Sequence, residues 1–205
     1  MKKENTDMIL LASASPRRKQ LLESAGLSLQ IEAADIDETR HPGELPVDFV
    51  QRMAREKARS VAAKHKQTDN TILAADTIVV HAGEILGKPH DIEDAKRMLR
   101  LLSGDVHSVY TGVCVIDQAN DREQVFFCET KVHFCELSEA QIDWYIGTGE
   151  PMDKAGSYGI QGKAACFVKE IQGSYTNVVG LPLCETLEAL SYEPPQLSKQ
   201  KHTNF

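Results

Sequence analysis

A short run of hydroxylated and basic residues near the N-terminus, Ser13-Ala-Ser-Pro-Arg-Arg18, has the residue types of a phosphate site. Ser15 is a favourable N-cap and Pro16 suits the first helical position, so a helix is expected to begin here. A helix start has free N–H groups and a partial positive charge, and both favour bound phosphate. Arg17 and Arg18 add planar donors that can grip phosphate oxygens in pairs. These residues indicate a phosphate-bearing ligand, although a capped surface helix with two solvated arginines would have the same sequence.

A carboxylate interrupts an apolar stretch in the segment Ile72-Leu-Ala-Ala-Asp76-Thr-Ile-Val-Val80. A charge in such a run is costly unless it is paired or binds a metal. Buried carboxylates near lysines and arginines are the usual bases and Mg²⁺ ligands of phosphate chemistry. We therefore interpret Asp76 as a functional residue. The alternative is a carboxylate at a strand end that caps a neighbouring loop.

Three further polar segments could contribute to the same site. Asp35-Ile-Asp-Glu38 follows a predicted strand, and Gly87-Lys88-Pro89 is a rigid turn that presents a lysine. The segment 153–163 is dense in glycine, which allows close backbone approach to a ligand, and its Gln161 offers an amide donor and acceptor suited to a base edge. The alternatives are an ordinary surface loop for this segment and a solvated side chain for Glu38.

Composition and missing motifs exclude several classes of function. The net charge of −7 argues against broad nucleic-acid binding, and no apolar run has the length of a membrane span or the form of a signal core. The sequence has no metal-binding histidine pattern, Walker A motif, GxSxG elbow or GxGxxG fingerprint. The five cysteines form no CxxC pair, so we interpret them as buried, reduced thiols of a cytoplasmic protein, although Cys128 and Cys135 could pair.

Alternating helix and strand patterns must position these residues. Asp91 is the expected N-cap of one helix, with Asp94 at the capping-box position. The mixture of elements implies an α/β (mixed α+β) fold with a long mixed β-sheet. The spacing of apolar residues predicts helices over residues 16–25, 46–65, 91–102, 138–146 and 183–190, and strands over 9–12, 29–33, 71–80, 106–116, 124–134 and 163–171.

Seven polar or glycine-containing motifs follow one another along the chain: Ser13-Ala-Ser-Pro-Arg-Arg18, Arg55-Glu-Lys57-Ala, Ala75-Asp76-Thr77, Gly87-Lys88-Pro89, Asp153-Lys154-Ala-Gly156, Tyr158-Gly-Ile-Gln161-Gly162 and Asn177-Val-Val-Gly180-Leu-Pro182. Together they resemble the Maf family of nucleoside triphosphate pyrophosphatases over about residues 8–191. The resemblance implies the inosine triphosphate pyrophosphatase-like (Maf/Ham1) fold, with helices flanking the sheet in two lobes and a central cleft. Residues 1–7 and 192–205 are then an N-terminal extension and a polar C-terminal tail.

The resemblance also implies a reaction, the hydrolysis of a nucleoside triphosphate to the monophosphate and pyrophosphate. The Gln161 motif resembles the branch that acts on dTTP and UTP. A divalent cation, Mg²⁺ with Mn²⁺ or Co²⁺ as alternatives, would bridge phosphate oxygens and the carboxylates of Glu38 and Asp76. Asp76 matches the family's proton acceptor and would activate the attacking water, and Lys57 and Lys88 would neutralise charge on the phosphates. The implied substrate-binding residues are Ser13, Arg17, Arg18, Lys57, Thr77 and Gln161.

The expected partner is the nucleoside triphosphate alone, without nucleic acid or membrane. A homodimer is also expected, because dimers are common in the family and are the default oligomer. Two other classes of function stay open. One is a phosphohydrolase that releases single phosphates, which product analysis would distinguish. The other is a nucleotide-binding regulator of septum formation with little or secondary catalytic activity, because Maf proteins are associated with septum inhibition.

Overall fold

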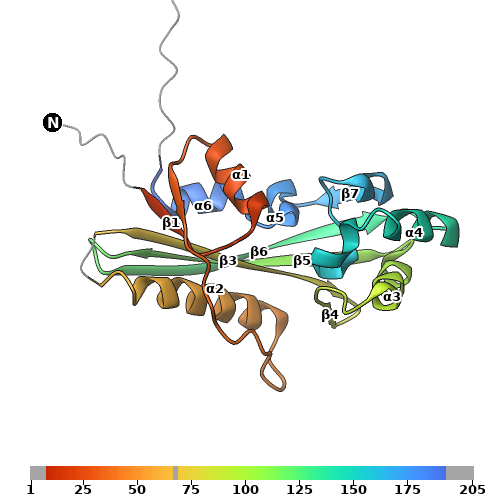
Figure 1. Ribbon diagram of the computed structural model, residues 1–205, viewed down its shortest axis with the longest axis horizontal. Helices are drawn as coiled ribbons and strands as arrows, with labels where there is room; N and C mark the ends of the chain where they lie inside the picture. Colours follow the sequence, from red (N-terminus) through yellow and green to blue (C-terminus); the bar gives the residue numbers. More distant parts are fainter. Residues whose placement is uncertain (1–7, 67–68, 193–205) are drawn as a thin grey trace, which may run out of the picture.

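A long mixed sheet runs through the protein in the computed structural model, which describes residues 8–66 and 69–192 (Figure 1). The predicted extension 1–7 and the tail residues 193–205 lie outside the described residues. In spatial order the strands are β2 (Leu29–Ile31), β1 (Ile9–Leu11), β3 (Thr71–His81), β5 (Val106–Asp117), β6 (Arg122–Phe134) and β7 (Val168–Gln172), and β4 (Glu84–Leu86) pairs with β3. β1 runs parallel to β2 and β3, and the other pairs are antiparallel, so the predicted mixed sheet is confirmed.

Helices cover both faces of this sheet and one of its ends. In Figure 1, α2 lies along one face, α1, α5 and α6 lie on the other, and α3 and α4 lie at the end remote from β1. Separate apolar cores fill the two lobes, one around β1, α1 and α6 and one around α3, α4 and β7. The helices of the described residues are α1 (Pro16–Ser24), α2 (Pro46–Ala62), α3 (Ile92–Leu102), α4 (Glu139–Ile146), α5 (Tyr175–Val179) and α6 (Leu183–Ala189).

The α2 helix packs unusually closely on the sheet because β5 has a glycine beneath it. The apolar residues of α2 recur at helical spacing, and the resulting stripe, which includes Val50, Met53 and Ala54, is fully buried. A Cβ at Gly112 would fall on the Val50 carbonyl group, well inside van der Waals contact. Gly112 pairs with Asp76 across the β3–β5 ladder. This glycine therefore lets α2 approach the sheet beside Asp76.

The edge of β3 opposite β5 is interrupted at its middle. β1 pairs with residues 71–73 of β3, and β4 pairs with residues 79–81, while β5 pairs along the other edge. Residues 74–78 therefore have no strand partner on the β1 side within the described part of the chain. Asp76 and Thr77 lie in this gap, between the two lobes.

Several local predictions are wrong. Residues Lys163–Phe167 form a 3-10 helix rather than a strand, because Ala164 and Phe167 both turn into the core beside β7. Asp91 caps α3 as predicted, but the Asp94 carboxylate accepts from His90 N–H and so does not complete a capping box. The strand β4 was not predicted.

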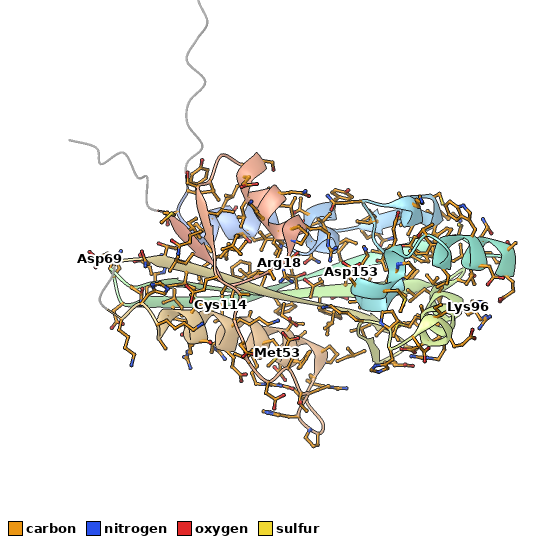
Figure 2. All side chains as sticks on the ribbon, viewed as in Figure 1. Arg18, Met53, Asp69, Lys96, Cys114 and Asp153 are labelled. Atoms are coloured by element: carbon orange, nitrogen blue, oxygen red, sulfur yellow. The ribbon has the colours of Figure 1, made fainter. Side chains whose placement is uncertain are left out.

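The prediction of buried cysteines holds only for Cys114, which lies on the α2 side of the sheet (Figure 2). The other four are partly or fully exposed. All five thiols are free, so Cys128 and Cys135 do not pair.

Candidate active site

A cleft of about 960 Å³ opens at the gap in the β3 edge, between the lobes. Its walls come from the start of α1, the loop before α2, α2 itself, β3, the turn after β4 and the segment before β7. A ligand in the cleft would therefore contact both lobes. All nine site residues predicted from the sequence line it: Ser13, Arg17, Arg18, Glu38, Lys57, Asp76, Thr77, Lys88 and Gln161.

Lys57, on α2, lies between the two acidic residues predicted as metal ligands. Its Nζ is 2.6 Å from Asp76 Oδ1 and 2.8 Å from Glu38 Oε1. The side chains of Lys57 and Asp76 are 12% and 13% exposed, whereas that of Glu38 is 59% exposed. The ion pair with Lys57 offsets the cost of placing the Asp76 carboxylate inside an apolar strand.

The loop that carries Glu38 is tied to α2 by Arg52. The Arg52 guanidinium donates to the two carboxylate oxygens of Glu44 at 2.6 and 2.7 Å, and to the Thr39 carbonyl at 3.1 Å. The hydrogen bonds from Arg52 lower the pKa of Glu44 to about 2. Glu38 therefore stands on an anchored loop, while its own side chain remains open to the cleft.

Arg18 joins α1 to the other face of the sheet. Successive strand residues point to opposite faces, so Thr77 faces α1 where Asp76 faces α2. Arg18 donates to Thr77 Oγ1 at 3.0 Å and to Ser13 Oγ at 3.1 Å. Its Nε donates to the Gly180 carbonyl at 2.8 Å. Burial lowers the pKa of Arg18 from its ordinary value, but a guanidinium stays charged in proteins. Contacts within the described part of the chain use three of its five N–H donors, which leaves two for a phosphate oxygen.

We expect Arg18→Ala to raise KM for every nucleoside triphosphate by a similar factor, because phosphate contacts carry no base information. Deleting a charge-assisted hydrogen bond costs about 1.5–3 kcal/mol, or roughly ten- to a hundredfold in KM. Steady-state kinetics with UTP and ATP would measure the effect, with Lys19→Ala on the exposed side of α1 as the control. Unchanged KM and kcat would mean that phosphate binds elsewhere.

Arg17 forms an ion pair across the cleft. Its Nη1 is 3.4 Å from Asp153 Oδ2, and Asp153 Oδ1 also accepts from Lys154 Nζ at 2.5 Å. Figure 2 shows the labelled Asp153 and Arg18 next to each other near the middle of the molecule. Lys154 lines the cleft and is only 17% exposed. Lys154 belongs to one of the motifs quoted above, but its place in the cleft was not predicted.

Lys88 and Gln161 line the cleft from two segments that are joined to each other. Gly156 N–H donates to the Gly87 carbonyl at 3.0 Å, which links the turn of Lys88 to the segment of Gln161. Gly156 has φ +65°, and a Cβ at this position would lie 3.0 Å from the Val79 side chain, so both the backbone conformation and the close packing favour glycine. Both Lys88 and Gln161 are exposed on the cleft wall and available to a ligand.

A buried contact between His107 and Tyr158 supports the segment that carries Gln161. His107 Nε2 lies 2.8 Å from the Tyr158 hydroxyl, and among the described residues the buried His107 Nδ1 has no hydrogen-bond partner. The Tyr145 hydroxyl accepts from Gly159 N–H at 3.1 Å. No spacing in the sequence reveals these contacts, because His107 comes from β5 and Tyr145 from α4.

His107 predicts a loss of stability in acid. Desolvation lowers its pKa from 6.5 to about 3, so His107 stays neutral in the folded protein while the unfolded chain binds a proton below pH 6.5. Its contribution to stability is therefore present above pH 6.5 and is lost as the pH falls toward 3. We expect the free energy of unfolding to fall by about 3 kcal/mol more between pH 7 and pH 4 in the wild type than in His107→Gln. Urea denaturation of both proteins at pH 7 and pH 4 would measure this difference. An equal fall in the free energy of unfolding in the two proteins would contradict the attribution to His107.

The acidic residues of the cleft suit a hard divalent cation. Mg²⁺ is usually held by one or two carboxylates together with water and substrate phosphates. Glu38 and Asp76 both approach one cationic atom, so their oxygens already converge on a single position. In the described part of the chain, no three acidic, histidine or cysteine side chains gather closely enough to hold a metal ion. Water or nucleotide phosphates would complete the coordination of a cation held by these two carboxylates.

The chain is similar to known proteins over most of its length. The family model for Maf-like protein matches residues 8–193. A dTTP/UTP pyrophosphatase from Anaeromyxobacter dehalogenans (strain 2CP-C) is 54% identical over 184 residues, which cover 89% of this chain and 92% of that protein. One from Bacillus cereus (strain ATCC 10987 / NRS 248) is 49% identical over 187 residues, covering 91% and 90%. The Staphylococcus aureus Ham1 protein has a TM-score of 0.51 at 14% identity, covering 90% of this chain and 97% of that chain.

The fold and the motifs lead to one family. The similarity to Ham1 confirms the predicted Maf/Ham1-like architecture. None of the helices in the described ranges combines the length and apolar character needed to cross a membrane. Because the family model spans nearly the whole chain and its motifs meet on a single cleft, the chain belongs to the Maf family.

Proposed function

We propose that this protein hydrolyses dTTP and UTP to the nucleoside monophosphate and pyrophosphate. The observation that carries the proposal is the cleft in which Asp76 and Glu38 meet Lys57, with Arg17, Arg18 and Lys88 on the surrounding walls. Carboxylates can accept a proton or hold a cation, and the basic side chains suit a polyphosphate. The relatives named dTTP/UTP pyrophosphatase support the same reaction.

In the proposed mechanism, Asp76 accepts a proton from the attacking water. Its fixed position on β3, next to the open edge, keeps the carboxylate within reach of a phosphate lying in the cleft. The two free N–H groups of Arg18, together with Arg17 and Lys88, would hold the phosphate chain and balance the charge that develops on it. Glu38 and Asp76 would hold a divalent cation, which when bound would neutralise phosphate charge.

Gln161 is proposed to select the base. Its amide has one acceptor and two donors, which can match the O4 and N3–H edge of uracil or thymine. Cytosine presents a donor at position 4 and an acceptor at N3, so one amide orientation cannot serve both bases. Unpaired polar groups cost about 1–3 kcal/mol each, so we expect kcat/KM for UTP to exceed that for CTP by roughly ten- to a hundredfold or more.

The variant Gln161→Glu should reduce this preference, because a carboxylate cannot donate to O4. The measurement is the ratio of kcat/KM for UTP and CTP in the wild type and in the variant. Equal efficiencies in the wild type, or the same ratio in both proteins, would remove Gln161 from base selection.

A screen of nucleoside triphosphates tests the proposed function. The purified protein with Mg²⁺ would be given dTTP, UTP, CTP, ATP and GTP, and pyrophosphate release would be recorded for each. We expect dTTP and UTP to give the highest rates. Release of pyrophosphate from none of the five, by a folded protein with Mg²⁺, Mn²⁺ or Co²⁺, would contradict the proposal.

A further inference from the structure

We infer that Lys57 occupies the cation position between Glu38 and Asp76 in the nucleotide-free protein and excludes a divalent metal until a triphosphate arrives. The inference rests on the proposed function, because it assumes that these carboxylates serve a metal-dependent reaction. It adds an order of events. Nucleotide phosphate first draws the Lys57 ammonium away from Glu38 and Asp76, and the two carboxylates then become available to a divalent metal.

The first support is the position of the ammonium group. Lys57 Nζ donates a hydrogen bond to Asp76 Oδ1 at 2.6 Å and forms an ion pair with Glu38 Oε1 at 2.8 Å. A metal bridging the same two oxygens would need the space that Nζ fills. Lys57 is 12% exposed, so water screens these interactions much less than it screens a surface ion pair.

The second support is that the packing of α2 prevents the helix from moving Lys57 away from the carboxylates. The neighbouring α2 residues Ala54 and Ala58 are fully buried, and the helix backbone rests on Gly112. Only the flexible side chain of Lys57 can move, by rotating about its own bonds. The ammonium can therefore pass between the carboxylates and a nearby phosphate while α2 stays in place.

The third support is the charge balance. Two carboxylates and one ammonium leave a net charge of −1, and the ammonium repels an approaching divalent cation at short range. A nucleoside triphosphate brings several negative charges into the cleft, and its oxygens offer the ammonium another partner. Metal affinity should accordingly be low in the free protein and should rise once the ammonium is removed.

Mn²⁺ binding to the nucleotide-free protein tests the inference. The free Mn²⁺ signal in electron paramagnetic resonance would be titrated with the wild type, Lys57→Met and Lys57→Gln. We expect both variants to bind Mn²⁺ at least about tenfold more tightly than the wild type. Lys57→Gln keeps a donor for the carboxylates without the charge, so it provides a second folded variant if Lys57→Met is unstable.

Two further variants locate the effect. Lys88→Met removes a cleft lysine that is not paired with either carboxylate, and its Mn²⁺ affinity should stay within about threefold of the wild type. The double variant Glu38→Gln/Lys57→Met should lose the gained affinity. Equal affinity in the wild type and both Lys57 variants would overturn the inference, as would an equal gain in Lys88→Met or retention of the gain in the double variant.

Pyrophosphate release by the wild type, measured in the same preparation, separates this inference from the proposed function. If the wild type releases pyrophosphate and Lys57 variants bind Mn²⁺ no better, only the exclusion by Lys57 fails. If Lys57 variants gain Mn²⁺ affinity but the wild type hydrolyses no triphosphate, the proposed reaction fails and the ammonium still competes with metal at this site.

Discussion

Replacing Asp76 with Asn is expected to lower kcat for UTP hydrolysis by roughly two to four orders of magnitude, the usual worth of general base catalysis. The amide keeps the shape of the side chain but cannot accept the proton of the attacking water. It also removes one charge from the proposed cation position, which would enlarge the loss. Asp76 is paired with Lys57 at 2.6 Å, so the variant tests a carboxylate that the fold holds in place.

Asp37→Asn is a matched control for this substitution. Asp37 lies next to Glu38 on the same loop, and its carboxylate accepts from Thr39 N–H rather than from a residue of the proposed site. Its kcat should stay within about threefold of the wild type. A folded Asp76→Asn protein with activity within a few fold of the wild type would remove Asp76 as the base.

The variant Gly112→Ala is expected to destabilise the protein by about 1–3 kcal/mol or more, because overpacking of a close-packed interior forces backbone shifts. The added Cβ would overlap the Val50 carbonyl, so α2 would have to move away from the sheet. Lys57 is carried by α2 and Asp76 pairs with Gly112, so the shift would also disturb the contact between them. Urea denaturation would show a lower midpoint, and residual enzyme should have a lower kcat.

The control is Gly147→Ala. Gly147 follows α4 with φ −61° and has only ordinary contacts at 3.4 Å around a built Cβ, so alanine fits there. We expect a stability within about 0.5 kcal/mol of the wild type. If Gly112→Ala proves as stable as Gly147→Ala, the close packing of α2 on β5 does not require a glycine at position 112.

The longest elements could be predicted from the sequence because their patterns are strong and local. The apolar stripe of α2 and the β-branched run of β3 each contain enough residues to identify the element. The three residues of β4 carry no such pattern, and they form a strand only because β3 is there to pair with. The 3-10 helix Lys163–Phe167 likewise depends on a core pocket that receives Phe167.

The residues of the candidate site were identified by motif, but their arrangement was not predictable from the sequence. That Lys57 joins Glu38 to Asp76 depends on the approach of α2 to β3. Arg18 was predicted as a phosphate ligand, and three of its donors also contact Gly180, Ser13 and Thr77 and so tie α1 to β3. These contacts join residues distant in sequence, so a pattern confined to one segment cannot indicate them.

The most direct test of the proposed activity is quantitative product analysis of UTP turnover. UMP, UDP, pyrophosphate and orthophosphate would be measured together by ion-exchange chromatography, with the purified wild type and with Asp76→Asn under identical conditions. The proposed reaction predicts UMP and pyrophosphate in equal amounts from the wild type, and almost none from the variant. UDP and orthophosphate as the products, or equal rates from the two proteins, would contradict it.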